Sequence, residues 1–238
     1  MPSPSDSILA VIPARGGSKG IPRKNLRKIN NQTLIEHAVR VAKGLGCIDK
    51  VVITSDDDEI HSLSEQLAVD LSVKRPAELS SDKAKSIDAW NHAWLEAEKF
   101  FKQSFEISVL LEPTSPMRTM DDVDETIKLL MKNSAANSVV TVSKTPGHYT
   151  PHKALQINAR GEIAPYLKDG AKYSIRQDIP DFYHRNGICY AVRRNSLIEN
   201  HNLMEHGCIP LIINRHVVNI DEEIDLKIAE FLMAKTQH

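Results

Sequence analysis

Mostly apolar runs alternate with segments of helical periodicity along this chain. The runs at residues 8–12, 51–54, 107–111 and 138–142 predict buried strands. Apolar positions at helical spacing predict helices over residues 33–45, 57–67, 84–101 and 121–131. This β-α-β order predicts an α/β fold, in which helices cover both faces of an open, mostly parallel, doubly wound sheet.

The regular pattern breaks between about residues 144 and 186, where prolines and glycines recur and only residues 154–157 are strand-like. An irregular stretch of this length in a compact domain is more often functional than slack, so we predict a functional excursion. Strands at 187–192 and 210–213 and a helix at 221–233 follow it. No linker or repeat marks a second domain, so we expect one domain over residues 1–238.

Composition narrows the classes of function. Hydrophobic residues make up 41% and charged residues 26%, as in an ordinary globular protein, and the net charge of -1 offers no overall basic field to nucleic acid or an anionic membrane. The three cysteines form no CxxC pair, which favours idle thiols in a reducing compartment. No signal peptide or membrane-spanning run is found, so we expect a cytoplasmic protein.

The loop after the first predicted strand carries the strongest chemical signal. Its sequence, from Pro13 to Leu26, reads PARGGSKGIPRKNL and combines three glycines with four cations, at Arg15, Lys19, Arg23 and Lys24. Glycines let backbone N–H groups approach an anion, and Arg can bind a phosphate with two hydrogen bonds. The loop suits a triphosphate, although neither a P-loop nor a GxGxxG spacing is present. On residue types alone, a solvated basic turn or a nuclear-localisation run remains open.

Several motifs in the same order resemble those of the acylneuraminate cytidylyltransferases, the CMP-sialic acid synthetases, from about residue 8 to 233. They are residues 12–25, Thr54-Ser55-Asp56-Asp57, residues 75–79 with Asp82 and Ser86, residues 113–118, residues 176–180, Asn186-Gly187, and Ile220-Asp221 with Asp225-Leu226. The resemblance implies a Rossmann-like nucleotidyltransferase fold. It also implies a homodimer, in which the irregular excursion reaches the neighbouring subunit.

The same resemblance implies transfer of CMP from CTP to the anomeric hydroxyl of an acidic nonulosonic sugar, with release of pyrophosphate. It assigns three kinds of contact. CTP would be held by Arg15, Ser18, Lys19, Lys24, Asn25, Arg75, Ser86 and Arg118, and the sugar by Glu112, Lys153, Arg176 and Tyr190. Mg²⁺ is implied as cofactor, with Asp221, Asn219 and Asp225 as candidate ligands, and Arg15, Lys24 and Asp221 would be catalytic.

Two positions depart from the family's pattern. Asn219 stands where the family usually has aspartate, and Glu112 stands where it usually has glutamine. We therefore hypothesise that Glu112 and Asp221 hold Mg²⁺ together, or that Glu112 faces an amine or hydroxyl of the acceptor; a weak metal affinity is a third possibility. Spacing alone favours Asp221 and Asp225 as residues that stabilise a helix start.

The acceptor and the retention of catalysis stay open at this stage. Sialic, legionaminic and pseudaminic acids are all candidates, and Leu203-Met204, in place of paired aromatics, favours a sugar other than sialic acid. A CMP-Kdo type of synthetase is the alternative within the class. A nucleotide-sugar-binding module that has lost catalysis is the alternative outside it, but the retained Arg15, Lys19, Lys24 and Arg118 argue against it. An oxidoreductase that uses NAD is a distant third alternative.

Overall fold

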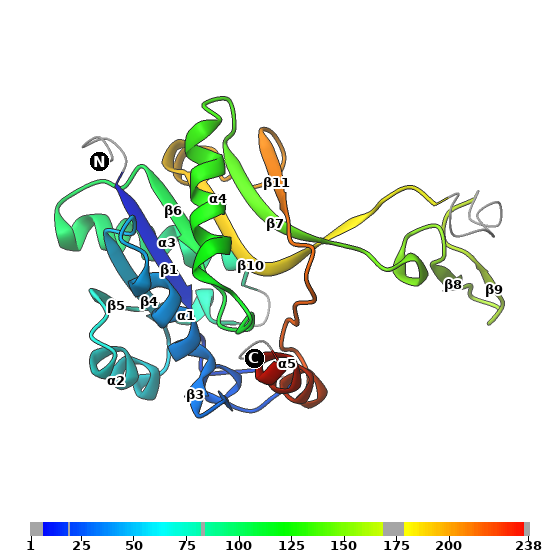
Figure 1. Ribbon diagram of the computed structural model, residues 1–238, viewed down its shortest axis with the longest axis horizontal. Coiled ribbons are helices and arrows are strands. Elements are labelled where there is room, and N and C mark those ends of the chain that lie inside the picture. Colours follow the sequence, from blue (N-terminus) through cyan, green and yellow to red (C-terminus); the bar gives the residue numbers. More distant parts are fainter. Residues whose placement is uncertain (1–6, 19, 82–83, 169–178, 236–238) are drawn as a thin grey trace.

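The centre of the molecule is a seven-stranded sheet (Figure 1). The computed structural model describes residues 7–18, 20–81, 84–168 and 179–235. The strand order is β11-β7-β10-β6-β1-β4-β5, formed by β1 (Ile8–Pro13), β4 (Lys50–Ser55), β5 (Leu71–Lys74), β6 (Ile107–Leu110), β7 (Ser138–Lys144), β10 (Tyr183–Arg193) and β11 (Cys208–Ile212). Only β10 runs antiparallel to its neighbours, β6 and β7, among these strands. The predicted mostly parallel sheet is confirmed.

Helices cover both faces of this sheet, because alternate residues of each strand point to opposite sides. Ile8, Ala10 and Ile12 of β1 belong to one core cluster, with apolar residues of α1 (Leu34–Gly44), α2 (Asp58–Gln66) and α4 (Met120–Lys132). Leu9 and Val11 belong to the other, against Trp90 and Trp94 of α3 (Ser86–Phe101). The doubly wound arrangement is therefore also confirmed.

The predicted helices begin within a few residues of their expected positions, and at α1, α2 and α4 polar side chains satisfy free N–H groups of the first turn. Thr33 and Glu36 form a capping box at α1, and Thr119 and Asp122 form another at α4. The side chain of Asp57 accepts hydrogen bonds from two N–H groups at the start of α2.

Some short elements were not predicted from the sequence. They are the edge strand β5, the two-residue hairpin strands β2 (Lys28–Ile29) and β3 (Gln32–Thr33), β9 (Ile163–Pro165), the 3-10 turns at Lys24–Leu26, Ala77–Leu79 and Gly147–Tyr149, and a π-helical segment at Asn195–Glu199. Each is too short for its periodicity to stand out from the surrounding loops.

The predicted excursion is an arm that projects from the body (Figure 1). Its described residues include β8 (Leu155–Ile157), which pairs with β9 in a sheet of its own. The excursion is shorter than the predicted 144–186, because β10 already begins at Tyr183, which pairs with Lys144. Apolar side chains on the arm lie open: Tyr149 is 80% exposed and Ile157 is 73% exposed.

The last helix, α5 (Glu223–Lys235), packs against the segment that follows β1. Leu226 and Ala229 of α5 form a third core cluster with Ile21, Ile29 and Ile220. This packing places residues 219–221 beside the first loop. None of the described helices is long and apolar enough to cross a membrane.

Candidate active site

Two cavities open near the carboxyl ends of β1 and β6, where open α/β sheets commonly bind ligands. The first, of about 220 Å³, is lined by Arg15, Ser18, Lys24, Asn25 and Arg75 among others. The second, of about 680 Å³, is lined by Arg185, Tyr190, His201, Leu203, Met204 and Asn219 among others. Lys85, Ser86 and Glu112 line both cavities, so the cavities adjoin at these three residues.

Two hydrogen bonds hold the first loop in place, one within the loop and one to the residue that follows β4. Asn25 donates its Nδ2 hydrogen to the carbonyl of Arg15 (2.9 Å), and the N–H of Gly16 donates to Oδ1 of Asp56 (2.9 Å). A Cβ atom on Gly16 would lie 2.5 Å from Oδ2 of Asp57, so only glycine fits there. The loop is therefore shaped before any ligand binds.

Arg23 does not join the cations that line the cavity. Its guanidinium pairs with Asp57 at 2.6 Å and with Glu59, which fixes the loop to the start of α2. Asp57 thus caps α2 and also holds the loop.

Lys24 and Asp221, both predicted to be catalytic, lie together. The Lys24 ammonium donates to the carbonyl of Ile220 (2.9 Å) and to Oδ1 of Asp221 (3.1 Å). A Cβ on Gly20 would lie 2.3 Å from the carbonyl oxygen of Asp221, so the loop and this segment are in close contact. Lys24 is thereby held at the wall of the first cavity.

Arg75 forms the buried end of the same cavity. Its side chain donates to the carbonyl of Thr54 (2.8 Å), the first residue of one predicted motif. Burial lowers the pKa of Arg75, Asp56 opposes this effect, and Arg15 adds to it. Arg75 and Arg15 therefore form a local positive region, and a bound anion would reduce the repulsion between the two guanidinium groups.

Arg118 lies outside both cavities, in contrast to its predicted contact with CTP. Its guanidinium is buried and donates to the carbonyls of Glu112 (2.7 Å), Gly187 (3.1 Å) and Ile188. Burial lowers the pKa of Arg118 to about 10. We infer that Arg118 supports the loop that carries Glu112 and β10, and does not face the nucleotide.

The second cavity contains predicted and unexpected residues. Tyr190, a predicted contact of the sugar, lines it, and burial raises the pKa of its hydroxyl to about 12. Arg185 and His201 were missed, as was Lys85 at the junction of the cavities. Arg185 precedes the predicted strand by two residues, so the pairing of residues 183–185 with β7 is what gives it a fixed place.

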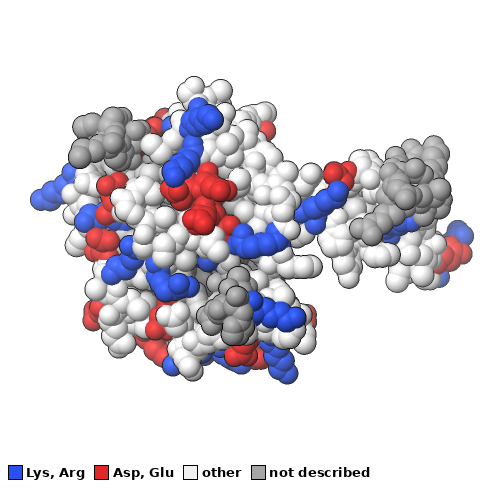
Figure 2. All heavy atoms as spheres, in the orientation of Figure 1, with Lys and Arg blue, Asp and Glu red and all other residues white. Residues whose placement is uncertain are grey.

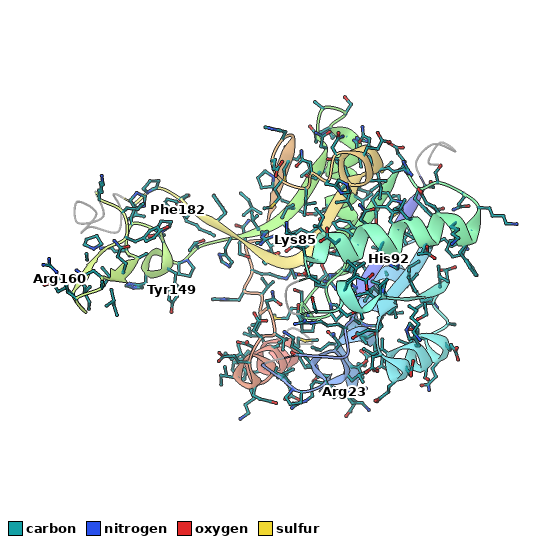
Figure 3. All side chains as sticks on the ribbon, turned by 180° about the vertical axis from the view of Figure 1, so that it is seen from behind. Arg23, Lys85, His92, Tyr149, Arg160 and Phe182 are labelled. Carbon is teal, nitrogen blue, oxygen red and sulfur yellow. The ribbon has the colours of Figure 1, made fainter. Side chains whose placement is uncertain are left out.

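One predicted ligand residue lies away from both cavities. Lys153 is on the projecting arm, whose Tyr149 and Arg160 are seen well away from Lys85 of the cavities (Figure 3). Lys19 and Arg176 lie outside the described residues.

The candidate magnesium ligands differ in availability. The carboxylate of Asp225 accepts hydrogen bonds from the N–H groups of Asp221 (2.9 Å) and Glu222 (2.8 Å), so it is engaged at the helix start. The side chain of Asp221 is 74% exposed, and Asn219 lines the second cavity. Among the residues described, no three His, Cys, Asp or Glu side chains are grouped to hold a metal.

A glycine-bearing cationic loop at the end of β1, beside two adjoining cavities in an α/β fold, suits a nucleotidyltransferase, in which a nucleotide and an acceptor bind side by side. The family model described as cytidylyltransferase matches residues 9–227, and the chain belongs to this family. The family that the sequence motifs resemble is thereby confirmed.

Relatives cover nearly the whole chain. Post-translational flagellin modification protein B of Campylobacter coli is 30% identical over 95% of this chain and 94% of its own. CMP-N,N'-diacetyllegionaminic acid synthase of Legionella pneumophila is 29% identical over 97% of both chains. Pseudaminic acid cytidylyltransferase of Campylobacter jejuni is 28% identical over 94% of this chain and 95% of its own.

Solved structures share the fold. A CMP:2-keto-3-deoxy-manno-octonic acid synthetase complexed with CTP has a TM-score of 0.71 at 19% identity, over 97% of this chain and 100% of its own. The 4-diphosphocytidyl-2C-methyl-D-erythritol synthase of Anaerococcus prevotii has a TM-score of 0.60 at 14% identity, over 97% of this chain and 99% of its own. The predicted nucleotidyltransferase fold is confirmed.

Proposed function

We propose that this chain transfers CMP from CTP to the anomeric hydroxyl of an acidic nonulosonic sugar and releases pyrophosphate. The observation that carries the proposal is the junction of the two cavities at Lys85, Ser86 and Glu112. One cavity has the cations for a triphosphate, and the other has room for a sugar. An acceptor hydroxyl in the second cavity would meet the α-phosphorus at the junction.

The nucleotide cavity favours the transfer by positioning and by charge. Arg15, Ser18 and Lys24 would hold the phosphates, with Lys19 from the same loop, while Arg75 and Ser86 would contact the base and ribose. Little covalent chemistry is asked of the protein, because most of the rate comes from aligning the two substrates and from neutralising phosphate charge. A module that has lost catalysis would have no need of this set of cations.

The acceptor cavity fits an acidic sugar with apolar substituents. Arg185 supplies a cation for the sugar carboxylate beside Tyr190, while Leu203 and Met204 offer apolar contacts. Two relatives are named for legionaminic acid and pseudaminic acid. These acids carry acylamino and deoxy groups that suit such contacts. We favour these acceptors over sialic acid and Kdo.

The test is pyrophosphate release from CTP with a panel of legionaminic, pseudaminic and sialic acids and Kdo. Release that depends on one nonulosonic acid and yields its CMP conjugate supports the proposal and names the acceptor. CTP binding without release for any acid supports the binding module, and release with Kdo alone supports the alternative synthetase.

We also propose Mg²⁺ as cofactor. The donor set fits an ion shared with the nucleotide, because Mg²⁺ needs only one or two carboxylates beside phosphate oxygens and water. Asp221 would supply the carboxylate and Asn219 a neutral oxygen, while Asp225 stays at the helix start. Bound Mg²⁺ supplies charge neutralisation at the phosphates.

Removal of divalent cations with EDTA is expected to abolish pyrophosphate release, and added Mg²⁺ to restore it. The Asp221→Asn variant is expected to need at least about tenfold more Mg²⁺ for half-maximal rate, because a ligand charge is lost. Glu222→Gln is the control, since its side chain is exposed next to Asp221. An unchanged Mg²⁺ requirement in Asp221→Asn would contradict the assignment.

A homodimer in the cytoplasm completes the proposal, because CTP is a cytoplasmic nucleotide. The arm exposes Tyr149, Leu155, Ile157 and Tyr166, an apolar surface of the kind that marks protein contacts. Lys153 on this arm would then reach the acceptor cavity of the second copy. On the face seen in Figure 2, charges of both signs are interspersed, in keeping with partners other than nucleic acid.

Sedimentation equilibrium is expected to give twice the mass of the chain, and Ile157→Asp to shift it toward the monomer. Leu95→Asp, on the exposed side of α3, is the matched control and should leave the mass unchanged. A wild-type protein that sediments as a monomer at micromolar concentration would rule the homodimer out.

A further inference from the structure

Glu112 occupies a special place between the two cavities. It lies two residues after the end of β6 and lines both the nucleotide cavity and the acceptor cavity. Among the described lining residues, it is the one acidic side chain that both cavities share. Its carboxylate therefore lies at the junction where a hydroxyl from the acceptor side would meet a phosphate on the other side.

The backbone around Glu112 is rigidly held. Arg118 donates to its carbonyl oxygen (2.7 Å), and the same guanidinium binds the carbonyl of Gly187. Gly187 has a φ of 71°, and a Cβ atom there would lie 3.0 Å from Oε2 of Glu112 and 2.6 Å from Oγ of Ser115. The close approach of β10 thus fixes where the carboxylate lies.

The carboxylate itself is left available. Within the described part of the chain, no residue is seen to donate a hydrogen bond to its oxygens, although cations lie nearby. A partly buried acceptor without a protein donor favours a donor from a ligand.

We propose that Glu112 is the general base of the transfer, so that its carboxylate accepts the proton of the acceptor's anomeric hydroxyl. This inference rests on the proposed function. As the proton moves to Glu112, the hydroxyl oxygen forms a bond to the α-phosphorus of CTP. The bond from that phosphorus to the oxygen bridging to the β-phosphate breaks, and pyrophosphate leaves with the electron pair. Glu112 then returns the proton to water.

The electrostatic surroundings suit this role. Burial raises the pKa of Glu112, with Asp221 adding to the effect, while Arg118, Arg185 and Lys24 oppose it. Tyr190 of β10 also faces Glu112, and Lys85 at the start of α3 lies at the same junction. A carboxyl group with a raised pKa is a stronger base than an ordinary one and is still ionised above that pKa. The transfer rate should therefore rise with pH through this ionisation.

The test is the rate constant of single-turnover CMP transfer, measured with the full-length protein, CTP, Mg²⁺ and the acid that the panel identifies. For Glu112→Gln, we expect a loss of about 10²-fold or more in this constant, with KM for both substrates within about threefold. The acid limb of the pH profile should disappear, and the Mg²⁺ needed for half-maximal rate should not change. Glu125→Gln, an exposed residue on α4, is the control.

A second variant keeps the test decisive. In Glu112→Ala, formate at high concentration should restore part of the lost rate, because it can take the place of the missing carboxylate. If Glu112→Gln needs more Mg²⁺ for half-maximal rate, Glu112 is a metal ligand. If the variant raises only KM for the acid and keeps the wild-type rate constant, Glu112 is a binding residue. Either result overturns the proposal. A wild-type protein that forms no CMP conjugate refutes the proposed function, whereas an active wild type with a fully active Glu112→Gln refutes only the general base.

Discussion

Replacement of Lys24 by methionine is expected to lower kcat/KM for CTP by about 10²–10³-fold, the usual effect of removing one preorganised charged donor from a transfer site. The ammonium group of Lys24 lines the nucleotide cavity and is held by Ile220 and Asp221. In the proposed function it would face the phosphates with little reorganisation when CTP binds. Steady-state kinetics with CTP as the varied substrate measures the effect.

Lys28→Met is the matched control for this prediction. Lys28 lies four residues further on, in β2, and its side chain is exposed away from the cavity lining. The control should retain the wild-type kcat/KM. If Lys24→Met stays within about threefold of wild type while it folds normally, the first loop does not hold the phosphates.

Replacement of Arg118 by methionine is expected to lower the free energy of unfolding by more than about 3 kcal/mol, because two buried carbonyl groups and one partly buried carbonyl group lose their donor. Those carbonyls belong to Glu112, Gly187 and Ile188, which join the loop after β6 to β10. Urea unfolding followed by circular dichroism measures the change.

The control is Arg40→Met, an exposed position on α1, which should change the free energy of unfolding by less than about 0.5 kcal/mol. If Arg118→Met unfolds like wild type but binds CTP weakly, Arg118 contacts the nucleotide after all. That result would favour the role that the sequence motif predicted over the one that the structure indicates.

The central sheet could be predicted because its strands are buried on both faces. Such strands form nearly continuous apolar runs, as Ile8–Pro13 and Lys50–Ser55 do, and the helices between them have one apolar side. The edge strand Leu71–Lys74 was missed because it has four residues and only Val73 is fully buried. The hairpin at residues 28–33 is shorter still.

The residue types of the first loop were enough to predict that it suits a triphosphate, but they could not predict the partner of each cation. Arg23 and Lys24 are neighbours in the sequence, yet Arg23 turns to Asp57 and Glu59 while Lys24 turns to Asp221. That division depends on how α2 and α5 pack beside the loop, which local sequence does not record. The junction at Glu112 likewise appears only when β6, α3 and β10 are assembled.

The most direct test of the central claim follows the phosphorus atoms of CTP. In parallel reactions with the favoured nonulosonic acid, CTP labelled at the α-phosphorus and CTP labelled at the γ-phosphorus are incubated with the enzyme, and the products are separated. The account predicts the α-label in the CMP-sugar and the γ-label in pyrophosphate, in equal amounts. γ-Label in the sugar product, or hydrolysis of CTP without a labelled conjugate, would contradict it.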